Sequence, residues 1–115
     1  MKILITENQL EKVALLWMNK NFSPDQLEIV TSEKYPDSIF YRKNGKVVME
    51  QNKKSKVFWF DYNEIYSFFE SFFSMEFEEW QRIMKIWLEE TFKLEGYTPY
   101  YRRTTPPKCW RILSN

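Results

Sequence analysis

The sequence predicts a single α+β domain. We expect an N-terminal helix, an antiparallel meander of three to four strands, and two C-terminal helices packed on one sheet face. Apolar residues recur at helical spacing near the start, form short blocks across the middle, and return to helical spacing after Asp61. A chain of 115 residues has the length of one domain. Residues 97–115 form a basic tail rich in proline and aromatic residues.

The first segment predicts a strand followed by a helix. Residues 1–5 are mostly apolar and short enough for a strand. Thr6 followed three residues later by Gln9 matches a capping box, which marks a helix start. The helix is expected over residues 7–20, and four residues at helical spacing are predicted to face the core: Leu10, Val13, Ala14 and Trp17.

The middle of the chain predicts an antiparallel hairpin. Asn44-Gly45 favours a tight two-residue turn, because both central residues need positive φ. Strands are expected over residues 27–31, 38–43, 46–51 and 56–60. A two-residue loop fixes the register, which pairs Lys43 with Lys46, Tyr41 with Val48 and Ile39 with Glu50.

The last third predicts two helices and a return to the sheet. Asp61 with Glu64 makes a second capping box, and the helix after it is expected to bury Ile65, Phe68, Phe69 and Phe72. A longer helix over residues 75–94 ends at Gly96, which suits the position after a helix. Residues 109–113 are predicted to form an edge strand.

The composition excludes several classes of protein. Histidine is absent, which removes the usual general base and the commonest metal ligand. The single cysteine, Cys109, excludes an internal disulfide and favours a reducing, cytoplasmic setting. Gly45 and Gly96 stand alone, so no glycine-rich phosphate loop exists. The apolar runs are too short for a signal peptide or a membrane span. We expect no catalytic residues, no metal and no cofactor.

The opening residues 1–10 (MKILITENQL) resemble the start of many short uncharacterised proteins from tailed phages and marine bacteria. The resemblance implies a phage or a bacterium with an AT-rich genome as the source. It implies no activity and assigns no role to any residue.

The most favoured function is a non-enzymatic protein-interaction module whose partner is another protein. The chain has ten Phe, seven Tyr and five Trp, and Tyr and Trp are enriched at interfaces. The same aromatic surplus also suits a core built from large side chains. Arginines and prolines join the aromatic residues in the tail, and the candidate partner-binding residues are Tyr100, Tyr101, Arg102, Arg103 and Trp110.

Two alternatives stay open. Residues 61–95 carry nine acidic and three basic groups, whereas residues 96–115 carry four basic and no acidic groups, so the charge is polarised. Basic groups interleaved with aromatic residues suit single-stranded nucleic acid, and the candidate residues are Arg42, Lys43, Lys46, Lys53, Lys54 and Lys56. The other alternative is a homo-oligomeric structural component that places its aromatic surplus between copies.

Overall fold

The computed structural model describes residues 7–102 and 105–114, and it confirms the α+β class. The expected strand over residues 1–5 and the Thr6 side of the first capping box lie outside these residues. The helices and strands follow in the order α1 (Glu7–Phe22), β1 (Glu28–Val30), β2 (Ser38–Lys43), β3 (Lys46–Asn52), β4 (Val57–Asp61), α2 (Ser67–Phe73), α3 (Phe77–Thr91), β5 (Thr98–Arg102) and α4 (Lys108–Leu113).

The five strands form one mixed sheet in the order β1-β2-β3-β4-β5. The first four make the predicted antiparallel meander, and β5 adds to β4 in parallel, with α2 and α3 in the connection. The prediction of an edge strand over residues 109–113 is wrong. These residues form α4, because Cys109, Trp110 and Leu113 share one helical face that packs on the sheet.

A β-bulge changes the hairpin register from the predicted one. Lys43 pairs with Lys46 as expected, but Tyr41 pairs with Met49 instead of Val48, and Ile39 pairs with Gln51 instead of Glu50. Val48 is the extra residue on β3 at this point. Because successive residues of a strand point to opposite faces, the inserted residue moves Glu50 to the face of Phe40.

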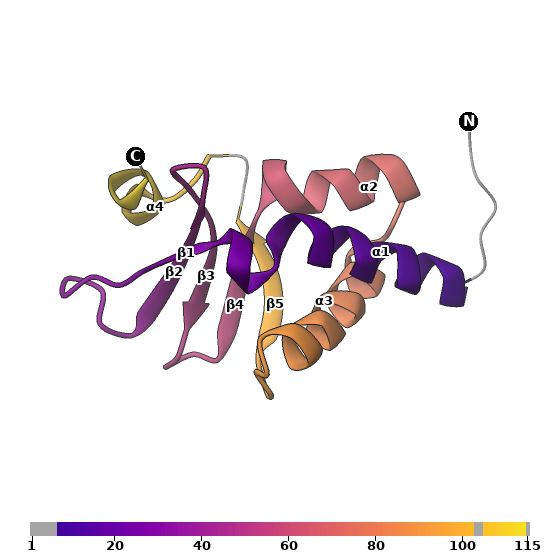
Figure 1. The fold of residues 1–115 in the computed structure, drawn as a ribbon, viewed down its shortest axis with the longest axis horizontal. Helices are drawn as coiled ribbons and strands as arrows, with labels where there is room; N and C mark the ends of the chain where they lie inside the picture. Colours follow the sequence, from indigo (N-terminus) through magenta and orange to yellow (C-terminus); the bar gives the residue numbers. More distant parts are fainter. Residues whose placement is uncertain (1–6, 103–104, 115) are drawn as a thin grey trace.

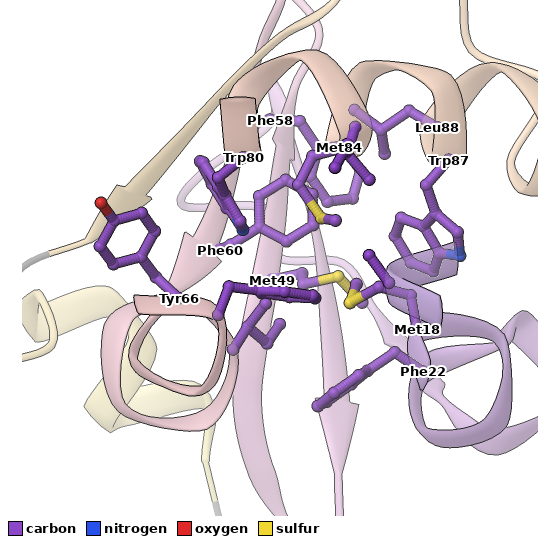
Figure 2. Close-up of a cluster of buried hydrophobic side chains, with 14 of the residues drawn as sticks. Met18, Phe22, Met49, Phe58, Phe60, Tyr66, Trp80, Met84, Trp87 and Leu88 are labelled. Atoms are coloured by element: carbon purple, nitrogen blue, oxygen red, sulfur yellow. The ribbon is translucent and has the colours of Figure 1, made fainter. Parts of the chain in front are cut away.

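Helices α1, α2 and α3 gather on one side of the sheet, and α4 lies on the other (Figure 1). Figure 2 shows the main core between the sheet and these three helices, built from large side chains that include Met18, Met49, Phe60, Trp80 and Trp87. A smaller cluster of Phe40, Val47 and Trp110 fills the space under α4. No helix of the described residues has the length and apolar character that crossing a membrane requires.

The buried row of α1 differs from the predicted one. Ala14, Met18 and Phe22, each four residues apart, are buried, whereas Val13 is exposed and Leu10 and Trp17 are half-buried. The expected set included Ala14 but was centred to one side of this row. Residues four apart lie on the same face of a helix, so these three side chains together pack α1 against the core.

The helix after Asp61 begins with a π-helical turn over Tyr62–Tyr66, and Asp61 caps it by accepting the Glu64 N–H at 2.8 Å. This confirms the Asp61 half of the predicted capping box, whereas the Glu64 carboxylate pairs with Lys46. A π turn holds one residue more than an α turn. Tyr66 is consequently buried with Ile65 and Phe69, whereas Phe72, expected in the core, is 63% exposed.

Helix α3 ends earlier than predicted. Its last residue is Thr91, and the chain turns away at Lys93, which has a φ of 58°. Gly96 also has a positive φ, of 78°, but it lies in the loop that leads to β5.

Three polar side chains form a chain of hydrogen bonds inside the sheet. The Tyr41 hydroxyl donates to Gln51 Oε1 at 2.9 Å, and Gln51 Nε2 donates to the Tyr97 hydroxyl at 2.9 Å. All three residues are buried. Burial, with a smaller contribution from Tyr97, raises the pKa of Tyr41 to about 12.

We predict that Tyr41 makes the domain sensitive to alkaline pH. Its pKa is raised above the ordinary value of 10.0 in the folded state, so the unfolded chain loses this proton first and stability falls between pH 10.0 and about pH 12. Across this pH range, the free energy of unfolding measured with urea is expected to fall by about 2–3 kcal/mol more in the wild type than in Tyr41→Phe. Parallel curves for the two proteins would contradict the assignment.

Candidate functional site

Glu50 is the centre of the sheet face that α4 covers. Its side chain is buried, with 4% of the residue exposed. Three donors from three different elements satisfy the carboxylate: Ser38 Oγ on β2 at 2.7 Å, Trp110 Nε1 on α4 at 2.8 Å and Arg102 Nη2 on β5 at 3.1 Å. A buried carboxylate is tolerated only with such partners.

The guanidinium of Arg102 lies close to two tryptophan rings. Its guanidinium carbon lies 4.0 Å from the centre of the Trp59 ring and 5.9 Å from that of Trp110. Arg102 Nε is buried and has no hydrogen-bond acceptor in the part of the chain that the structure describes. The Arg102 side chain is 27% exposed, so it pairs with the buried Glu50 and also reaches the surface.

A hollow of about 340 Å³ opens beside Arg102. Its walls are Trp59, Tyr101, Arg102, Thr105 and Pro107. Trp59 also lies next to Tyr100 on the neighbouring strand, with ring centres 5.7 Å apart, and Tyr100 is 39% exposed. This part of the face therefore presents aromatic surface and one cation together.

A second hollow, of about 230 Å³, lies between β3 and α4. Lys46, Val47, Pro106, Trp110, Arg111 and Ser114 line it. The adjacent residues Pro106 and Pro107 belong to the two linings, so this proline pair separates the hollows. Neither lining contains a carboxylate among the described residues.

The structure brings four of the five candidate partner-binding residues to this region, in different environments. Tyr100 and Arg102 reach the surface. Tyr101 is half-buried and stacks on Tyr66, with ring centres 4.1 Å apart. Trp110 is buried, with 1% exposed, and holds α4 on the sheet. Arg103 lies outside the described residues.

The six candidate nucleic-acid-binding residues do not form one patch. Arg42, Lys43 and Lys46 lie at the Asn44-Gly45 turn, and the other three, Lys53, Lys54 and Lys56, lie in the loop at the far end of β3. A strand of seven residues separates the two groups by roughly 20 Å.

The cations at the turn already have partners within the fold. Arg42 pairs with Glu28 and donates to Leu113 O at 3.0 Å, which closes the end of α4. Lys43 donates to Asn21 O near the end of α1, and Lys46 pairs with Glu64 at 3.1 Å. Basic side chains commonly close helix C-termini in this way.

The loop lysines are more open. Lys53, Lys54 and Lys56 are exposed, and the Lys56 ammonium lies 5.0 Å from the centre of the Tyr97 ring. The ammonium groups of Lys53 and Lys54 have no acidic partner within residues 7–102 and 105–114.

The site contains one cysteine, next to Trp110. Burial is the largest cause that raises the pKa of the Cys109 thiol, followed by the nearby Glu50 carboxylate. The thiol is therefore protonated at neutral pH and is a weak nucleophile. The described ranges hold no group of three or more acidic, histidine or cysteine side chains arranged to bind a metal ion.

Sequence analysis missed Glu50 and Trp59. Glu50 was placed on the opposite sheet face because the bulge was not predicted. Trp59 was read as one residue of an apolar strand, and its role as the platform for Arg102 depends on β5 lying beside β4. The one signal for this position is a glutamate that directly follows the apolar run of residues 47–49 within a predicted strand.

Comparison of the chain with protein-family models, with curated proteins and with solved structures finds no match. The resemblance of residues 1–10 to short phage and bacterial proteins stays an expectation from the sequence.

We predict that Glu50 is a main determinant of stability. Glu50→Gln removes the charge that balances Arg102, and the free energy of unfolding is expected to fall by roughly 3 kcal/mol. The measurement is urea unfolding followed by circular dichroism. Glu64→Gln is the matched control, because its pair with Lys46 is about half exposed and should contribute less than about 1 kcal/mol. Equal losses in the two variants would show that the Glu50 cluster has no special role.

Proposed function

We propose that this domain is a non-enzymatic module that binds another protein through the β4–β5–α4 face. The observation that supports this proposal is the pair formed by exposed Tyr100 and half-buried Trp59 beside Arg102, at the rim of a hollow on the sheet face opposite the main core. Trp, Tyr and Arg are the residue types that contribute most to protein–protein binding.

The fixed position of Arg102 supports the proposal further. The ion pair with Glu50 and the Trp59 ring hold the guanidinium in place before any partner arrives. A side chain that is already ordered loses little conformational entropy on binding. The exposed part of this face is therefore preorganised for recognition.

The charges around Tyr100 favour a protein over a nucleic acid. Tyr100 contacts Phe77 at the start of α3, with ring centres 6.0 Å apart. The residues on either side of Phe77 are Glu76 and Glu78, and both are exposed. A phosphate backbone carries a negative charge at every nucleotide and would meet these carboxylates where it crosses Tyr100, whereas a protein segment can present an uncharged residue there and place its charges elsewhere.

The nucleic-acid alternative rests on the open lysines of the β3–β4 loop. Lys53 and Lys54 are exposed in the loop that precedes β4, the strand that carries Trp59. In this alternative they contact phosphates while bases stack on aromatic rings. This alternative predicts that Lys53→Glu with Lys54→Glu weakens binding, and that affinity falls steeply as salt rises.

Affinity capture from bacterial lysate, with and without nuclease, tests the proposal. We expect the tagged chain to recover one defined protein that survives nuclease. Tyr100→Ala should reduce that recovery strongly, because it removes the exposed ring while leaving the buried cluster intact.

Phe72→Ala is the matched control for this experiment. It removes an aromatic ring that is more exposed than that of Tyr100, 63% against 39%, from α2 on the opposite side of the sheet, and should leave recovery unchanged. The proposal fails if Phe72→Ala abolishes recovery while Tyr100→Ala does not. Recovery that disappears with nuclease supports the nucleic-acid alternative instead.

A further inference from the structure

The two hollows beside the proline pair share a distinctive chemistry. Each combines apolar surface with an arginine: Trp59, Pro107 and Arg102 in the first, and Pro106, Trp110 and Arg111 in the second. Pro106 and Pro107 separate them, so one chain lying across the prolines can reach both.

The exposed charges on α4 beside the hollows are positive. Arg111 and Lys108 are exposed on α4, and neither has an acidic partner among the described residues. The nearest buried carboxylate, Glu50, is 4% exposed and already accepts three hydrogen bonds. A ligand in the hollows therefore meets cations and no exposed carboxylate from their linings.

We propose that the hollows flanking Pro106 and Pro107 bind an acidic, extended segment of the partner protein, with carboxylates at Arg102 and Arg111 and apolar side chains between them. This inference rests on the proposed function, because it names the partner chemistry of the same face. The inference rests on charge complementarity. Aspartate or glutamate side chains of the segment would pair with the arginines, which bind carboxylates with directional hydrogen bonds.

The shape of the region favours an extended segment over a helix. Residues of the sheet contribute to the lining of both hollows, and each hollow is also lined by one of two consecutive prolines, which keep a fixed backbone. An extended chain directs alternate side chains to one side, so residues two apart can enter neighbouring hollows.

Selection of a random peptide library displayed on phage tests the inference. The library is selected on the wild-type chain and on two charge-matched variants. Lys108→Gln with Arg111→Gln removes two exposed cations beside the hollows, and Lys12→Gln with Lys20→Gln removes two exposed cations from α1. These substitutions spare the buried Glu50–Arg102 pair, so all three proteins are expected to fold.

We expect the wild type and the α1 variant to enrich peptides that carry two or more acidic residues. These peptides should bind the α4 variant about tenfold more weakly, and added salt should weaken their binding to the wild type. Neutral or basic peptides, an absence of enriched peptides, or equal binding to all three proteins would overturn the inference. Tighter binding of a single-stranded oligothymidine than of any selected peptide would also overturn it.

Tyr100→Ala separates this inference from the proposed function. Selected peptides that are not acidic but lose affinity for Tyr100→Ala would support the proposed face and reject the acidic partner. Acidic peptides that bind Tyr100→Ala and the wild type equally would support the hollows and reject the role of the Trp59–Tyr100 pair.

Discussion

The buried carboxylate of Glu50 is the constraint on which the rest of this face depends. A charge removed from water needs donors, and here they come from β2, β5 and α4, which are far apart in sequence. If any one of these elements left its place, the carboxylate would lose a hydrogen-bond donor or become exposed to solvent. Glu50 therefore makes the parallel strand β5 and the short helix α4 parts of one structure with the meander, although α4 has only six residues.

The sequence predicted the fold class and the order of elements from α1 to α3, but not β5, α4 or the bulge that positions Glu50. The Asn44-Gly45 turn and the Lys43–Lys46 pair are confirmed, because turn chemistry is local. The bulge at Val48 is not local. Val47, Val48 and Met49 are all buried, so their apolar run fits either register and alternation cannot decide between them. The register of β3 is set by side-chain packing on both faces of the sheet, and the resulting register places Glu50 under α4.

The C-terminal segment was predicted less well for a related physical reason. A run of five or six residues does not distinguish a strand from a helix by periodicity alone. In residues 109–113 the choice depends on Trp110, whose indole N–H reaches Glu50, and on Arg42, which closes the end of α4. Both partners are about sixty or seventy positions away in the sequence. The α1 face and the exposure of Phe72 likewise depended on neighbours that sequence spacing does not show.

The aromatic surplus has mostly a structural use, and this narrows the search for a binding surface. Rings from the sheet and the helices contact one another throughout the core, including Phe58, Phe60, Trp80 and Trp87. Composition alone therefore says little about partners. What distinguishes the β4–β5–α4 face is that Trp59 and Tyr100 remain reachable around an arginine whose position Glu50 already fixes. The same ion pair thus contributes to the fold and orders the proposed binding surface, so substitutions that loosen it should weaken folding and, if the proposal holds, binding together.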